Sequence, residues 1–90
     1  MVKYAIYRNN RGMRGYTQDN PFHRERKMLG ETVGHLREKR KMTQEDLADA
    51  ADINVSYLAK IENGYVNTTV RYLIKIARGL RVSVRDLFEF

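Results

Sequence analysis

A chain of 90 residues is long enough for one small domain, and this length excludes a large multidomain enzyme. The absence of cysteine excludes a disulfide framework and a thiolate metal site, and two histidines are too few for a histidine cluster. Hydrophobic residues make up 42% and charged residues 31% of the chain, a balance typical of a folded globular protein. No apolar run has the length of a signal peptide or a membrane span, so we expect a cytoplasmic protein with no membrane partner.

Positive charge is concentrated near the start of the chain, and a basic protein of this size is typical of those that meet a polyanion. The net charge is +6, and residues 1–28 hold seven Lys and Arg against two acidic residues. Residues 29–90 hold ten Lys and Arg against nine acidic residues. The sequence therefore predicts a basic N-terminal arm over residues 1–28 and a nearly neutral domain over residues 29–90.

The arm carries charge but no recognisable motif. Arg8, Arg11 and Arg14 recur every three residues among Asn and Gly, a spacing that can place guanidinium groups along phosphates or in a narrow minor groove. Two alternatives stay open: a loosely docked or disordered tail that raises solubility, and a short strand over residues 2–7 that pairs with a partner.

From about residue 22 onward, apolar residues recur with the period of an α-helix. Leu29, Val33 and Leu36 share one face and predict a first helix that ends near Arg40. The same reasoning predicts four more helices, over residues 44–52, 55–62 and 69–80 and from residue 83 onward. No strand pattern competes in this region, so the predicted fold is all-α.

Residues that commonly begin helices stand at the predicted starts. Thr43, Asn54 and Thr69 are N-cap residue types that accept hydrogen bonds from the first turn. Ser83 and Asp86 have the spacing of a capping box. An Asn-Gly pair closes the third helix, with the glycine available for a left-handed turn.

The second and third helices are short and separated by about three residues, so they are expected to cross steeply, as in a helix-turn-helix. On the third helix, Ser56 and Lys60 lie opposite the apolar side formed by Leu58 and Ile61. Such a polar stripe suits the major groove, where these two side chains reach base edges and Val55 meets a thymine methyl. The alternative is an ordinary solvated helix face.

A longer spaced pattern reaches well beyond this helix. It comprises Leu29-Gly30, Leu36-Arg37, Met42-Thr43-Gln44-Glu45-Asp46-Leu47-Ala48, Ile53-Asn54, Tyr57-Leu58, Ile61-Glu62-Asn63-Gly64, Leu73, Ile76-Ala77, Leu80, Val82-Ser83 and Leu87-Phe88. With these motifs at these spacings, residues 29–88 resemble the Cro/repressor-type (XRE-like) family of helix-turn-helix transcriptional regulators. The resemblance implies a five-helix lambda-repressor-like domain that binds DNA and acts as a homodimer.

The resemblance also implies roles for individual side chains. The implied base contacts are Val55, Ser56, Tyr57 and Lys60. The implied phosphate contacts are Thr43, Gln44, Asn54, Asn63, Tyr65, Asn67 and Thr68. Arg37 and Glu62 match an internal ion pair that joins the first helix to the third. Three alternatives stay open: Gln44 is solvated, Tyr57 packs sideways on the scaffold, or Asn63 serves the turn alone.

Two positions depart from the usual family pattern. Asp52 stands where glycine is usual at the turn, and aspartate tolerates the left-handed conformation better than most residues. Thr68 stands where proline is frequent before the fourth helix. Asn67 and Thr69, with the following Val70 and Leu73, are more similar to the controller proteins of restriction-modification systems than to phage repressors.

The sequence offers no nucleophile motif, and no cysteine or carboxylate lies at ligand spacing from His23 or His35, so neither catalysis nor a cofactor or metal is expected. We expect a transcriptional regulator, such as a repressor, that binds a palindromic operator in double-stranded DNA and blocks or contacts RNA polymerase. Its homodimer is expected to form through Leu87, Phe88 and Phe90. The alternative is a protein-interaction or RNA-binding module, such as an antitoxin or a bridging factor.

Overall fold

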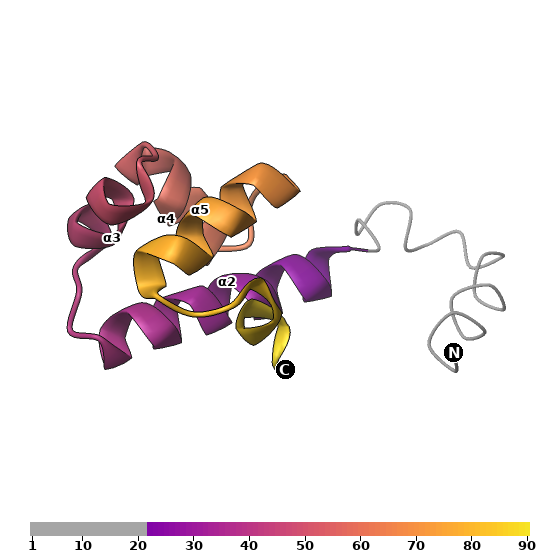
Figure 1. Cartoon of the computed structure of the whole chain (residues 1–90). Helices are drawn as coiled ribbons and strands as arrows, with labels where there is room; N and C mark the ends of the chain where they lie inside the picture. Colours follow the sequence, from indigo (N-terminus) through magenta and orange to yellow (C-terminus); the bar gives the residue numbers. More distant parts are fainter. Residues whose placement is uncertain (1–21) are drawn as a thin grey trace, which may run out of the picture.

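The computed structural model describes residues 22–90 (Figure 1). Its elements are α2 (His23–Lys39), α3 (Gln44–Ala51), α4 (Val55–Glu62), α5 (Val70–Leu80) and the 3-10 helix η2 (Val84–Phe88). The described part of the chain is therefore helical, which confirms the predicted all-α class. The fifth predicted helix is a short 3-10 helix. The arm arginines Arg8, Arg11 and Arg14 and the strand considered for residues 2–7 lie outside the described residues.

The first helix begins earlier than the boundary that charge suggested. It starts at His23, so residues 23–28, which the charge count placed in the arm, form the first turns of α2. Arg, Glu, Lys and Met are good helix formers, and the backbone N–H of Arg26 already donates to the carbonyl of Phe22 at 3.0 Å. The start at His23 agrees with the helical period expected from about residue 22, and the change in charge after residue 28 falls within the helix.

The helix starts follow the predicted capping residues. The side-chain oxygens of Thr43, Asn54 and Thr69 each accept a backbone N–H from the first turn of the helix that follows. The carboxylate of Asp86 accepts the backbone N–H of Ser83 at 3.0 Å, as expected for the predicted capping box. Local side-chain chemistry thus determines where these helices begin.

The four α-helices in residues 22–90 end in one common way. Each is followed by a residue with left-handed backbone dihedral angles: Lys41, Asp52, Gly64 and Arg81, with φ of 59°, 57°, 74° and 60°. The next residue in each case donates its N–H to a carbonyl five positions back, at 2.9 to 3.1 Å, which is the Schellman arrangement. This turn reverses the chain sharply, so the short helices pack around one core.

The core lies where α2, α3, α4, α5 and η2 meet. Its buried members are Leu29, Val33, Leu47, Ala48, Ala51, Leu58, Ile61, Leu73, Ile76, Ala77, Leu80 and Leu87. Helix α3 packs on α5, and α2 packs on α4 and on η2. In Figure 1, α3, α4 and α5 gather on one side of α2, and the yellow C-terminal segment lies against α2. No helix within residues 22–90 is long and apolar enough to cross a bilayer.

The expected role of Leu87 in a dimer interface is wrong. Its side chain is 0% exposed within the single chain, because η2 turns it into the core. Phe88 and Phe90, the other two residues expected in that interface, are 46% and 48% exposed. The C-terminal apolar residues therefore divide into one core residue and two surface residues.

Candidate nucleic-acid interface

Helix α4 places its predicted base-reading residues on the surface. Leu58 and Ile61 anchor the helix in the core, while Val55, Ser56 and Lys60 are exposed. These three side chains lie on the first two turns of α4, and the capping residue Asn54 precedes them. The exposed face is small and polar, with one cation, which is the chemistry that base edges in a major groove accept.

Two predicted phosphate contacts begin helices α3 and α4. The hydroxyl oxygen of Thr43 accepts the N–H of Asp46 at 3.0 Å, and Oδ1 of Asn54 accepts the N–H of Ser56 at 2.7 Å. Both caps use the acceptor atom of the side chain, whereas a phosphate binds donors, so capping is compatible with a phosphate contact. The Asp46 carboxylate in turn accepts the N–H of Thr43, and this hydrogen bond is the main cause that lowers the pKa of Asp46.

The carboxylate of Glu62, at the end of α4, joins three helices. Arg37 Nε on α2 donates to its Oε2 at 2.8 Å and Arg37 Nη2 to its Oε1 at 3.2 Å. Gln44 Nε2 on α3 donates to the same Oε1 at 3.0 Å, and Arg37 Nη1 donates to the Met42 carbonyl at 2.8 Å. The hydrogen bonds from Arg37 to Glu62 raise the pKa of Arg37, outweighing its desolvation. Gln44 is therefore a brace between the two short helices rather than a freely solvated side chain.

Tyr57 adopts the sideways-packed alternative. Its ring lies against Tyr72 of α5, with centroids 4.6 Å apart, and its hydroxyl donates to Thr68 Oγ1 at 3.4 Å. The Tyr57 side chain therefore does not lie on the polar stripe of Ser56 and Lys60, and it joins α4 to α5. A base contact from this ring would require it to leave that packing.

The loop that follows α4 holds four of the predicted phosphate contacts. The amide nitrogen of Asn63 donates to the Ala59 carbonyl at 2.9 Å, so this side chain does serve the turn. Tyr65 is 71% exposed, and Asn67 is also exposed. Thr68 is the half-buried partner of the Tyr57 hydroxyl.

This loop is also tied to the start of α2, a contact that sequence reasoning missed. Arg26 Nη1 donates to Asn67 Oδ1 at 3.2 Å. A Cβ atom built on Gly64 would lie 2.9 Å from the Cα of Lys27, so the loop and helix backbones touch. The two partners are 41 residues apart in the Arg26–Asn67 pair, and no local pattern could have revealed them.

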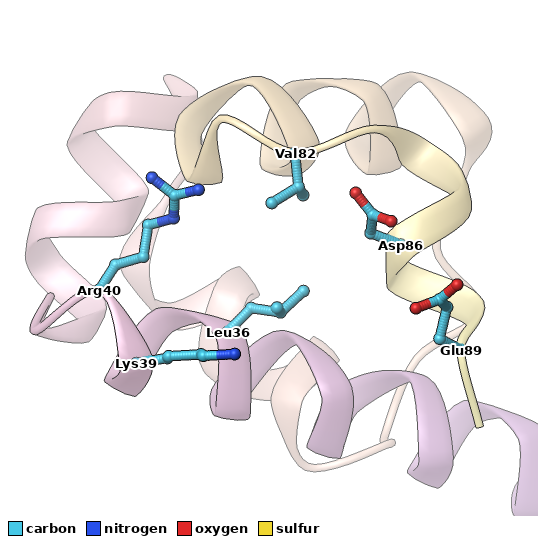
Figure 2. A pocket seen from close by; sticks show the side chains of 6 residues that line it. All are labelled: Leu36, Lys39, Arg40, Val82, Asp86 and Glu89. Atoms are coloured by element: carbon cyan, nitrogen blue, oxygen red, sulfur yellow. The ribbon is translucent and has the colours of Figure 1, made fainter.

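A surface pocket of about 590 Å³ lies outside the helix-turn-helix. Figure 2 shows Lys39 and Arg40 at the end of α2 across the pocket from Asp86 and Glu89 of the C-terminal segment, with Leu36 and Val82 between them on opposite sides. Arg40 Nη2 donates to the Arg81 carbonyl, next to Val82, at 3.4 Å. Within residues 22–90, no group of three histidine or carboxylate side chains is placed to hold a metal ion.

Comparison with known proteins agrees with this geometry. Residues 35–87 match the Helix-turn-helix family. The chain is 35% identical over 66 residues to Control protein C.BamHI of Bacillus amyloliquefaciens, covering 72% of this chain and 82% of that protein. It is 36% identical over 61 residues to the HTH-type transcriptional regulator DdrOP3 of Deinococcus deserti, covering 68% of this chain. The chain spans only 47% of the length of that second relative.

Solved structures show the same similarity. The restriction-modification controller protein C.AhdI of Aeromonas hydrophila superposes with a TM-score of 0.70 at 28% identity, covering 71% of this chain and 97% of that one. The wild-type controller protein C.Esp1396I has a TM-score of 0.65 at 33% identity, covering 70% of this chain and 82% of that one.

Proposed function

The chain belongs to the helix-turn-helix family, and from that premise we propose that it is a DNA-binding transcriptional regulator that reads duplex DNA with α4. The exposed stripe of Val55, Ser56 and Lys60 carries this proposal, because a major groove accepts a helix with such a face. The Glu62 network supports it, since it fixes α4 relative to α2 and α3.

Phosphates on either side of the groove would be bound by two groups of residues. Thr43, Gln44 and Asn54 stand at the starts of α3 and α4, where the helix dipole favours an anion. The second group is the loop set of Asn63, Tyr65, Asn67 and Thr68. These contacts position the protein, and the α4 stripe supplies the sequence preference.

The regulator acts as a symmetric dimer on a palindromic operator. Phe88 and Phe90 have ring centroids 6.3 Å apart and remain half exposed. They line a surface groove of about 450 Å³ together with Leu29, Val66 and Leu73, and the groove also includes Asn67 and Thr68 of the loop set. Burying this patch against a second copy would remove apolar surface from water, and a dimer with α4 helices about 34 Å apart matches one turn of DNA.

The basic arm supplies further backbone contacts. Because Arg26 binds the loop at Asn67, the chain enters α2 beside the proposed phosphate contacts. Arg8, Arg11 and Arg14 lie ahead of that point in the sequence and are proposed to bind phosphates or a narrow minor groove next to the site. The bound dimer would then act on transcription by blocking RNA polymerase or by contacting it.

Selection of random duplexes on the purified protein tests the proposal. We expect enrichment of one half-site in inverted repeat, and binding of that duplex at least about a thousandfold tighter than a scrambled duplex at equal salt. A matched RNA duplex is the control. Failure to enrich any sequence, or equal affinity for the RNA, would contradict sequence-specific DNA binding and favour the RNA-binding alternative.

A further inference from the structure

The turn that leads into α4 contains a non-glycine residue in a conformation that favours glycine. Asp52 has φ of 57° and ψ of 52° at the end of α3, three residues before Val55 opens α4. An L-residue with a side chain adopts this region at a cost in free energy, because its Cβ crowds the following carbonyl. The direction in which the chain enters α4 depends on this residue.

A lysine of α5 holds that turn. Lys75 Nζ donates to the Asp52 backbone carbonyl at 3.2 Å and lies 3.9 Å from the Asp52 carboxylate. The carbonyl belongs to the C-terminal end of α3, where the helix dipole favours a cation. The Lys75 side chain is 29% exposed, whereas the Asp52 side chain is 98% exposed, so the contact lies at the surface.

The same lysine also lies beside an aromatic contact between α5 and α4. Its Nζ is 5.8 Å from the ring centroid of Tyr72, three residues earlier on α5. The Tyr72 ring packs on Tyr57, at 4.6 Å between centroids, and Tyr57 belongs to α4. Lys75 and Tyr72 thus hold α4 at two points, through the turn before it and through the side of its first turn.

We propose that Lys75 is a positioning residue for DNA readout, which sets the orientation of α4 by holding the left-handed Asp52. It is proposed to act without touching DNA, because its ammonium group is directed at the turn and at Tyr72. This inference rests on the proposed function. It adds that the base preference of α4 depends on a cation of α5.

The first test compares Lys75→Met with Arg78→Met. Both variants remove one positive charge from α5, and Arg78 is exposed on the same helix. On the selected duplex we expect Lys75→Met to bind about tenfold more weakly, with less than about threefold loss on a scrambled duplex. Arg78→Met should lower the two affinities equally. A Lys75→Met protein with the same ratio of affinities as Arg78→Met would overturn the inference, whereas a wild-type protein that binds no duplex would overturn the proposed function instead.

A rescue experiment separates positioning from direct contact. Glycine adopts the left-handed region freely, so Asp52→Gly should make Lys75 dispensable, and the double variant should regain the wild-type ratio of affinities within about threefold. If the double variant stays as impaired as Lys75→Met, Lys75 acts on DNA by another route and the proposal fails. If Lys75→Met alone does not fold, the comparison is made between Asp52→Gly and the double variant Asp52→Gly, Lys75→Met. Equal base preference of these two proteins supports the proposal, and unequal preference overturns it.

Discussion

Arg37 and Glu62, 25 residues apart, form an ion pair with two hydrogen bonds of 2.8 and 3.2 Å, and their side chains are only 13% and 9% exposed. The pair joins the long helix α2 to the C-terminal end of α4, and Gln44 attaches α3 to the same carboxylate. The helices α2, α3 and α4 therefore share one partly buried polar centre.

Glu62→Ala should lower the free energy of unfolding by about 1.5 to 3 kcal/mol, because the partly buried Arg37 guanidinium loses its carboxylate partner and keeps the Met42 carbonyl. Denaturant unfolding measures the change. The control is Glu38→Ala, since Glu38 lies 3.8 Å from the same guanidinium but is 69% exposed, and its loss should cost less than about 1 kcal/mol. Similar losses in the two variants would show that burial does not determine the strength of the Glu62 pair.

Gly30→Ala and Gly34→Ala, one turn apart on α2, should behave oppositely. A Cβ on Gly30 would collide with the Ile61 carbonyl oxygen and lie 2.5 Å from that of Glu62, so we expect destabilisation of roughly 3 kcal/mol. A Cβ on Gly34 meets only the end of the Glu62 side chain, at 3.4 Å, and alanine there should stabilise the helix by up to about 1 kcal/mol. Thermal unfolding of both variants checks this, and a tolerated Gly30→Ala would mean that α2 and α4 do not pack this closely.

Base preference should depend on Ser56 and Lys60. Replacing either with alanine leaves the core intact and should reduce discrimination at particular base pairs by about 1 to 3 kcal/mol. Gln44→Ala should instead weaken binding to all sequences, because it is assigned to a phosphate. Binding of the selected duplex and of single-base variants measures both effects. Equal weakening of Lys60→Ala on specific and random duplexes would remove its base-reading assignment.

The C-terminal aromatic residues should control association. Phe88→Glu and Phe90→Glu introduce a charge on the exposed groove, so sedimentation should show monomers that remain folded. Leu87→Glu would place a carboxylate in the core and should prevent stable folding. Folded dimers of Phe88→Glu would place the interface elsewhere, and the segment 2–7 would be the next one to delete.

The Thr43–Asp46 cap of α3 should stabilise the protein less at acidic pH than at neutral pH. The pKa of Asp46 is lowered in the folded protein by the N–H of Thr43 and then by its hydroxyl. The contribution of Asp46 to the free energy of unfolding is therefore fully present above its unfolded-state pKa of about 3.9, and it is lost as the pH falls through the lower folded-state pKa. The difference in unfolding free energy between wild type and Asp46→Asn should shrink as pH falls from 6 to roughly 2. Glu45→Gln, an exposed neighbour, is the charge control, and a difference that does not vary with pH would contradict the capping role.

Much of the fold could be predicted from the sequence, because its determinants lie within a few residues of each other. The caps at Thr43, Asn54 and Thr69 act over two or three positions, and they place the helix starts. The third helix was predicted over residues 55–62 and occupies Val55–Glu62. The helical period expected from about residue 22 agrees with the start of α2 at His23, whereas the change in charge after residue 28 lies inside that helix.

The sequence by itself determined which helices form, where they begin and that α4 carries an exposed polar stripe, since capping and apolar periodicity are local properties of the chain. Where a side chain could contact any of several neighbours, only the tertiary structure determined which neighbour it contacts. Packing of the helices places Leu87 in the core, the Tyr57 ring against the Tyr72 ring, and the Lys75 ammonium group within hydrogen-bond distance of the Asp52 carbonyl. These outcomes depend on contacts between residues distant in sequence, whose free energies are set by the way whole helices pack, and no spacing rule along the chain encodes that packing.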